Sequence, residues 1–161
     1  MPQNQNNHSD IPFLSRLIAT GFFSGYSPVV PGTAGSLVGL AFYAIPGMEK
    51  NITLSLAILA TFFVGIYTSN QMEKKLGEDP QVVVIDEVVG MWISLFFLPK
   101  GMWTGLLAFF FFRIYDTLKP PPARKLEHLQ NGWGIMLDDV AAGIYANVTV
   151  RLLLLIFPNI I

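Results

Sequence analysis

Long stretches without charge constrain this chain more than any other feature of its sequence. No charged residue occurs from Leu17 to Met48. The run "ITLSLAILATFFVGIYTS" at 52–69 is close to the roughly 20 residues that a helix needs to cross a bilayer. Only 13% of the residues are charged and the mean hydropathy is +0.50, whereas a soluble domain has about 25% charged residues. The sequence therefore predicts a membrane protein.

Five apolar segments are expected to form membrane-embedded helices, because backbone groups in a bilayer must bond within their own segment and these runs lack strand alternation. They lie at 34–47, 52–69, 84–98, 102–118 and 137–157. We expect a short interfacial helix before them, at about 11–23. The predicted fold class is all-α and polytopic. A disordered polar tail at 1–10 is expected to precede a single helical catalytic domain at 11–161.

Basic residues predict the orientation, because cytoplasmic loops carry an excess of lysine and arginine. We expect both polar loops, 70–81 and 120–134, to face the cytoplasm. That side then holds Arg16, Lys74, Lys75, Lys119, Arg124 and Lys125, with Arg113 near its boundary, and the other side holds Lys50 and Lys100. Arg151, within the last apolar run, is expected to snorkel outward.

This topology brings four polar motifs to one membrane face, although they are far apart in the sequence. "PGTAGS" opens the first span, "DE" opens the third, "RIYDTLK" closes the fourth and "DD" opens the fifth. Polar residues that converge at one depth from four segments indicate a functional site. Acidic residues within membrane segments are themselves functional by default.

Two pairs of carboxylates are the first candidates, at Asp86, Glu87, Asp138 and Asp139. Gly90 and Gly143 each follow one aspartate by four residues, on the same helical face. Helices that pack through these glycines would bring the acids together. A cation would relieve the resulting repulsion, and oxygen ligands without His or Cys suit Mg²⁺ or Mn²⁺. The alternative is that acids at helix N-termini only complement the helix dipole.

The segment "FRIYDTLKPPP" carries Arg113, Asp116 and Lys119 at intervals of three residues, on one drifting helical stripe. Asp116 could add a metal ligand, while Arg113 and Lys119 could hold a phosphate. The alternative is an internal ion pair with a snorkelling lysine. The prolines are expected to end the helix.

The segment "SPVVPGTAGS" places Thr33, Gly35 and Ser36 at the start of a helix. Free backbone N–H groups and hydroxyls at such a position can bind an anion such as phosphate, with Thr33 as a candidate N-cap. The alternative is an ordinary capped turn.

The amino-acid composition excludes some kinds of catalytic site and gives no indication of others. The absence of cysteine removes thiolate nucleophiles and zinc–thiolate sites, and the net charge of −1 gives no indication of nucleic-acid binding. His128 stands alone in a polar loop, where we expect it to be solvated.

Four blocks in order resemble the phosphatidylglycerophosphatase A family, Mg²⁺-dependent lipid phosphatases of the bacterial inner membrane. They are "GFFSGYSPVVPGTAGS", "VVIDEVVGMWI", "FRIYDTLKPPP" and "GWGIMLDDVAAG", with Asn131 in place of the first glycine of a pair that is usual in the family. The resemblance implies hydrolysis of phosphatidylglycerophosphate, a phospholipid in the membrane, to phosphatidylglycerol and phosphate. It also implies an active site that faces the cytoplasm.

The combined hypothesis assigns a role to each candidate. Asp86, Glu87, Asp138 and Asp139 hold one or two Mg²⁺, Asp116 completes the catalytic acids, and Thr33, Gly35, Ser36, Arg113 and Lys119 bind phosphate. Two rival classes are a divalent-cation transporter, which would need acids near the midplane, and a non-catalytic membrane subunit. A CDP-alcohol phosphotransferase is disfavoured because its longer acidic motif is not found. A homo-oligomer is left open.

Overall fold

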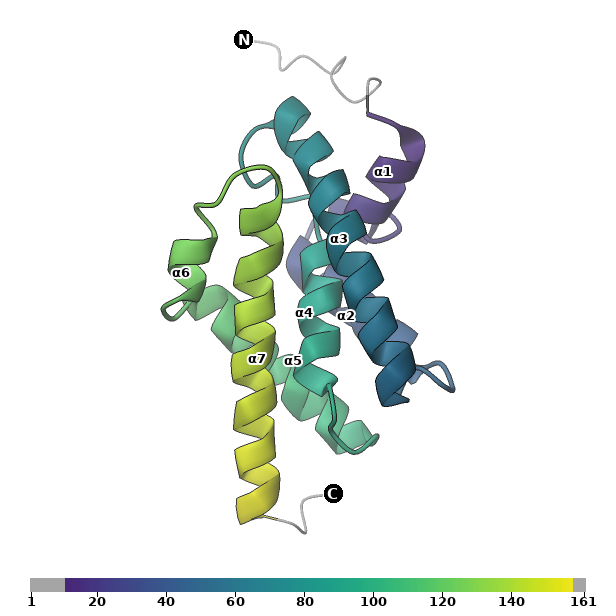
Figure 1. Cartoon of the computed structure of the whole chain (residues 1–161), viewed down its shortest axis with the longest axis vertical. Coiled ribbons are helices and arrows are strands. Elements are labelled where there is room, and N and C mark those ends of the chain that lie inside the picture. Colours follow the sequence, from purple (N-terminus) through teal and green to yellow (C-terminus); the bar gives the residue numbers. More distant parts are fainter. Residues whose placement is uncertain (1–10, 158–161) are drawn as a thin grey trace.

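The computed structural model describes residues 11–157 (Figure 1). Its elements are α1 (Phe13–Ala19), the 3₁₀ turn η2 (Ser24–Tyr26), α2 (Pro31–Ala44), α3 (Asn51–Leu76), α4 (Ile85–Leu95), α5 (Met102–Leu118), α6 (Ala123–Leu126) and α7 (Trp133–Ile156). No strand occurs in this part of the chain, so the predicted all-α fold is confirmed. The polar tail expected at 1–10 lies outside the described residues.

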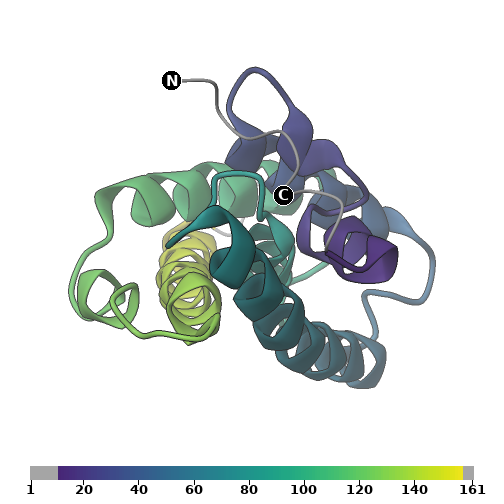
Figure 2. The ribbon, with the colours of Figure 1, turned by 90° about the horizontal axis from the view of Figure 1, so that it is seen from above.

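Helix α4 forms the centre of the bundle. It contacts α2, α3, α5 and α7, and Figure 2 shows the other long helices around it. Nearly every α4 side chain is buried, including the fully enclosed Val89, Met91 and Leu95. A helix that is apolar on all sides belongs inside a bundle, so the run "VVGMWISL" reflects packing against other helices and not contact with lipid.

The predicted count of five membrane-embedded helices is not supported. Two helices of the described chain, α3 with 26 residues and α7 with 24, are long and apolar enough to cross a membrane. Helices α2, α4 and α5 have 14, 11 and 17 residues. At 1.5 Å per residue they reach about 21, 16 and 25 Å, less than the ~30 Å hydrocarbon core.

Several predicted boundaries were also wrong. Helix α1 ends at Ala19, because Gly21, Phe22 and Phe23 adopt left-handed conformations that terminate it. Helix α3 continues to Leu76, through residues expected in a polar loop. Helix α7 begins at Trp133, so Asp138 lies in its second turn and not at its start. The prolines do end α5 at Leu118, as predicted.

The C-terminal end of α4 receives its hydrogen bonds from α7. The Asn147 amide donates to the carbonyls of Ile93, Ser94 and Phe96 at 3.2, 3.1 and 2.8 Å. Arg151 donates to the same Phe96 carbonyl at 2.7 Å and to the Asn147 side chain at 2.7 Å. The expectation that Arg151 snorkels outward was therefore wrong, because free carbonyls at a helix end need donors.

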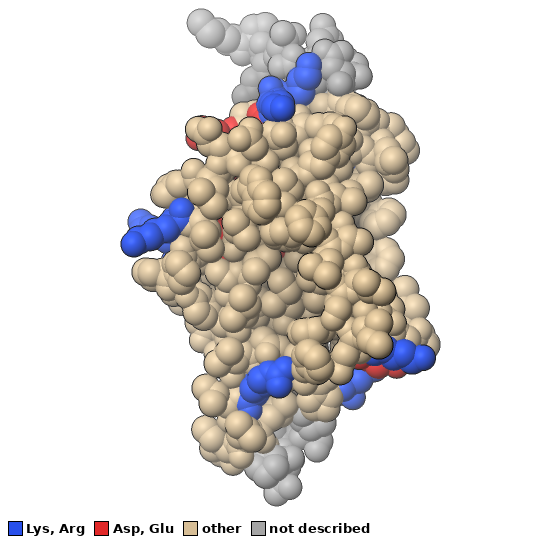
Figure 3. All heavy atoms as spheres, in the orientation of Figure 1, with Lys and Arg blue, Asp and Glu red and all other residues tan. Residues whose placement is uncertain are grey.

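Charged side chains on the face drawn in Figure 3 gather at the upper end, the upper left flank and the lower end, with an uncharged band between them. At the lower end, Lys100 and Glu49 form an ion pair at 3.1 Å. The predicted site residues occupy the opposite end, where α4 and α7 begin and α5 ends. The fold therefore separates a polar end that carries the site from the loops at the far end.

Candidate active site

The first pair of carboxylates lies in the first turn of α4. Glu87 is 9% exposed and its Oε1 accepts a hydrogen bond from Arg113 Nη1 at 3.4 Å. Helix α2 passes directly over this turn: a Cβ added at Gly35 would lie 2.7 Å from Glu87 Oε2, and one at Gly32 would overlap Glu87 Oε1. Glycine is required at position 35, where the Cβ would also lie 2.9 Å from the Val84 carbonyl oxygen, whereas at Gly32 it would meet only the ends of side chains.

The second pair lies in the second turn of α7. Asp138 and Asp139 are 6% and 2% exposed, and no acidic residue occupies the first turn of this helix. The dipole effect is confined to the first turn, so it does not account for this pair. Complementing the helix dipole therefore remains an alternative role only for Asp86 and Glu87, which lie in the first turn of α4.

The predicted glycine packing is confirmed. A Cβ on Gly143 would lie 2.5 Å from the Gly90 carbonyl oxygen, and a Cβ on Gly90 would lie 2.9 Å from the Asp139 carbonyl oxygen. The two backbones are therefore in contact one turn from the acids. As a result, Asp139 lies within electrostatic range of Asp86 and Glu87.

Arg113 lies at the centre of the polar groups contributed by α2, α4 and α5. Its guanidinium pairs with Asp116 Oδ2 at 3.0 Å and Glu87 Oε1 at 3.4 Å, and donates to Ser36 Oγ at 3.4 Å. The internal ion pair weighed from the sequence is therefore present, but it is joined by groups from two other helices. Asp116 is also within electrostatic range of Asp139.

Lys119 links the end of α5 to α7. Its ammonium pairs with Asp138 Oδ2 and Glu127 Oε2, each at 2.7 Å. Burial acts to lower the pKa of Lys119, but the hydrogen bonds to Asp138 and Glu127 raise it above its ordinary value. The same hydrogen bond lowers the pKa of Glu127. Lys119 is thus a fixed positive charge at the site and not a snorkelling lysine.

The start of α2 is not capped in the way that the sequence predicted. The N-cap position is Val30, in a left-handed conformation, and Pro31 opens the helix; the expectation that Thr33 is the N-cap was therefore wrong. No side chain caps the first-turn N–H groups, which leaves donors at this helix start. Ser36 is buried, with its hydroxyl between Arg113 and the Gly32 carbonyl.

Three buried carboxylate oxygens at this end have no hydrogen-bond partner: Asp86 Oδ1, Glu87 Oε2 and Asp139 Oδ2. A buried anionic oxygen without a partner is costly, and a proton or a cation relieves that cost. These donors are all oxygen, which suits a hard divalent cation. Among residues 11–157, however, no three acidic or histidine side chains already stand at metal-binding spacing. The donor chemistry fits Mg²⁺, and binding it would require the carboxylates to move together.

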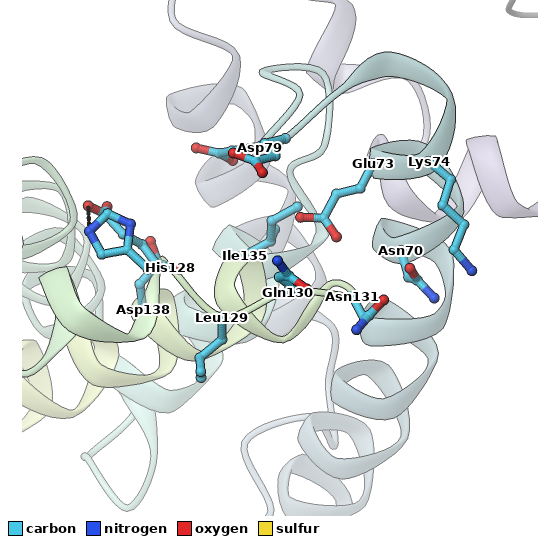
Figure 4. Close-up of a pocket in the computed structure, with 12 residues that line it drawn as sticks. Asn70, Glu73, Lys74, Asp79, His128, Leu129, Gln130, Asn131, Ile135 and Asp138 are labelled. Carbon is cyan, nitrogen blue, oxygen red and sulfur yellow. Dashed lines mark ion pairs between the residues drawn. The ribbon is translucent and has the colours of Figure 1, made fainter.

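A polar cavity of about 500 Å³ adjoins the acids and was missed from the sequence (Figure 4). Its lining includes Asn70 and Glu73 from α3, Asp79 from the next loop, His128 from the loop before α7, and Asp138. Both polar loops were expected on one side, but their pattern does not show that they enclose a cavity. The one sequence feature that could have indicated the cavity is that both loops are rich in charged and amide residues.

Two left-handed residues shape the wall of this cavity. Asn131 and Gly132 have φ values of +63° and +77°, and a Cβ on Gly132 would overlap the Ile66 carbonyl of α3. Asparagine tolerates this conformation better than most residues, which explains why Asn131 can replace a glycine. The Gly132 N–H donates to Glu73 at 2.7 Å, so the loop is held to α3.

A helical bundle with a buried cluster of carboxylates, an arginine and a lysine at one end has the groups that an enzyme acting on a charged, phosphate-like substrate requires. The chain belongs to the phosphatidylglycerophosphatase A family, whose model matches residues 17–154. It is therefore a phosphatase. No solved structure matches the chain.

Named relatives agree with this assignment. The chain is 40% identical over 131 residues to phosphatidylglycerophosphatase A of Escherichia coli, covering 80% of this chain and 76% of that protein. It is 41% identical to the Haemophilus influenzae protein of the same name, covering 83% and 85%. A Bacteroides thetaiotaomicron protein named "Putative phosphatidylinositol-3-phosphatase" is 42% identical, covering 86% and 92%.

Proposed function

We propose that this protein hydrolyses the terminal phosphomonoester of phosphatidylglycerophosphate, giving phosphatidylglycerol and inorganic phosphate for phospholipid biosynthesis. The observation that carries the proposal is the convergence of buried carboxylates from α4 and α7 with Arg113 and Lys119, in a chain of this family. We place the protein in the bacterial inner membrane as a multi-pass protein, with the site facing the cytoplasm. The basic residues of the two polar loops support that orientation.

Asp86, Glu87, Asp138 and Asp139 are the residues that would hold Mg²⁺, with Asp116 beside them. When bound, Mg²⁺ supplies positive charge that neutralises the phosphoryl oxygens and makes a water more acidic. The unpartnered oxygens of Asp86, Glu87 and Asp139 support this role, because they are buried and carry no hydrogen bond that binding would break.

Arg113 and Lys119 are proposed to bind the phosphoryl oxygens. Both are held beside the carboxylates before substrate arrives, so little side-chain entropy is lost when a phosphate oxygen replaces a carboxylate partner. The Ser36 hydroxyl and the uncapped N–H groups at the start of α2 add neutral donors on the same side. Thr33 and Gly35 lie in this turn of α2, and Gly35 leaves room for Glu87.

We propose water as the nucleophile, with the buried carboxylates as proton acceptors. An aspartate nucleophile would instead leave a phosphorylated protein during turnover. Acid quenching of the enzyme with substrate labelled in the terminal phosphate distinguishes the two. Labelled phosphate without labelled protein is expected, and labelled protein would contradict water attack.

A second candidate substrate is a phosphoinositide, favoured by the 42% identity to the Bacteroides thetaiotaomicron relative and by a cavity large enough for a sugar-like ring. Phosphate release by the purified protein should be compared on phosphatidylglycerophosphate and phosphatidylinositol 3-phosphate. Faster release from the former supports the proposal, and preference for the latter replaces it. Release from neither, together with cation flux in proteoliposomes, would favour a transporter.

A further inference from the structure

A second, apolar groove lies on the other side of α4 from the acids of α7. It has a volume of about 320 Å³ and runs between α1, α2 and α3, with α4 as its floor. Ile85, Val88 and Trp92 form that floor, and their spacing of three and four residues places them on one face of the helix. The groove therefore follows α4 for two turns, about 10 Å, starting at its first residue.

The groove begins at the turn of α4 that also carries the first pair of carboxylates. Ile85 and Val88, which line the groove, immediately flank Asp86 and Glu87 in the sequence. One turn of α4 thus presents carboxylates to one side and the end of the groove to the other. A molecule with a phosphorylated head at Glu87 and an apolar tail along Val88 would contact both.

The walls are apolar and held in place. Phe22 lies against Phe42 with ring centroids 5.6 Å apart, which joins the α1 and α2 sides. Trp92 Nε1 donates to the Gly39 carbonyl at 2.8 Å, which fixes α2 to α4 at the far end. On the α3 side, Ala60 and Val64 face the groove.

We propose that this groove binds one acyl chain of the phospholipid substrate and so positions its headgroup at the carboxylates; this inference rests on the proposed lipid phosphatase function. The acyl chain moves from the lipid bilayer into an equally apolar groove, so the hydrophobic effect adds no binding free energy. The contribution is orientation: a chain laid along α4 fixes the depth and direction of the phosphomonoester.

The test compares two Trp substitutions on α3. Ala60→Trp fills the groove, whereas Leu59→Trp adds a ring to the neighbouring exposed position, which does not line it. Each variant is assayed on long-chain phosphatidylglycerophosphate and on a short-chain, water-soluble analogue. Ala60→Trp is expected to lower kcat/KM for the long-chain lipid about tenfold or more and to spare the short-chain analogue, while Leu59→Trp changes neither. Unchanged long-chain turnover in Ala60→Trp would overturn the proposal.

Photolabelling tests directly whether an acyl chain occupies the groove. The wild-type protein is mixed with phosphatidylglycerol that carries a photoreactive group in one acyl chain. Labelling is expected to concentrate on the peptides that contain Val64 and Trp92 and to decrease with excess unlabelled lipid. Labels spread evenly over the exposed apolar residues would overturn the proposal, and this result decides the matter if Ala60→Trp loses activity on both substrates. Lack of phosphate release by the wild type would refute the proposed function and leave this labelling test standing.

Discussion

Gly143 packs directly against Gly90, with space for no side chain between them: a Cβ on Gly143 would lie 2.5 Å from the Gly90 carbonyl oxygen. This contact joins α7 to α4 one turn from Asp139 and Asp86. The geometry of the carboxylate cluster therefore depends on two residues that take no part in chemistry.

We expect Gly143→Ala to destabilise the protein by about 1–3 kcal/mol, because the added methyl group meets backbone that cannot move away cheaply. Gly105→Ala on α5 is the matched control, since its Cβ would lie 3.4 Å from the flexible end of Leu40. Thermal unfolding in detergent measures both variants. Equal melting temperatures for the two would show that the glycine contact does not hold the helices together.

Replacement of one buried acid should lower turnover by orders of magnitude while the protein still folds. Asp86→Asn and Asp139→Asn each keep the size of the side chain but remove a charge that a cation needs. Glu49→Gln removes an acid at the opposite end, where Glu49 pairs with Lys100, and should retain full activity. Wild-type turnover by either Asn variant at saturating Mg²⁺ would remove that carboxylate from the metal site.

Arg113→Lys should lower kcat/KM about tenfold or more, although the charge is kept. Nη1 of the guanidinium contacts Glu87, Asp116 and Ser36 together, and a lysine ammonium has no second nitrogen to offer a phosphoryl oxygen beside those contacts. Arg124→Lys, on the exposed side of α6, is the control. If Arg113→Lys were as active as the control, the site would need only a positive charge at this position.

The Lys119–Glu127 pair predicts a dependence of stability on pH. The hydrogen bond from Lys119 lowers the pKa of Glu127, so the stabilisation is present above the unfolded-state value of about 4.3 and is lost as pH falls through the folded-state pKa. Lys119 has a raised pKa, so its own contribution is intact at neutral pH. Glu127→Gln should cost about 0.2–1 kcal/mol at pH 7. Thermal unfolding should show this cost vanishing in acid, and a cost that is independent of pH would contradict the assignment.

The sequence predicted the packing of α4 against α7 better than it predicted the membrane topology. The i, i+4 spacing from Asp86 to Gly90 and from Asp139 to Gly143 carries geometric information, because a helix fixes which residues share a face. That spacing correctly indicated the contact between α4 and α7. The short interval from Arg113 to Asp116 likewise indicated their ion pair.

The predicted number of membrane-spanning helices was too high because it was based on hydrophobicity alone. The run around Val88 and Met91 is as apolar as a membrane helix, yet it forms an 11-residue helix enclosed by its neighbours. Burial in protein and burial in lipid select the same residue types, so composition does not separate them. The pairing of Glu127 with Lys119 and the cavity beside Asp138 were also missed, because contacts between loops follow no periodic pattern.

Phosphate release from phosphatidylglycerophosphate by the purified protein, with Mg²⁺ and then with EDTA, tests most directly whether the carboxylates of α4 and α7 work through a divalent cation. Phosphate release is expected with Mg²⁺, should be lost in EDTA, and should return when Mg²⁺ is added in excess of the chelator. Full activity in EDTA would contradict the account.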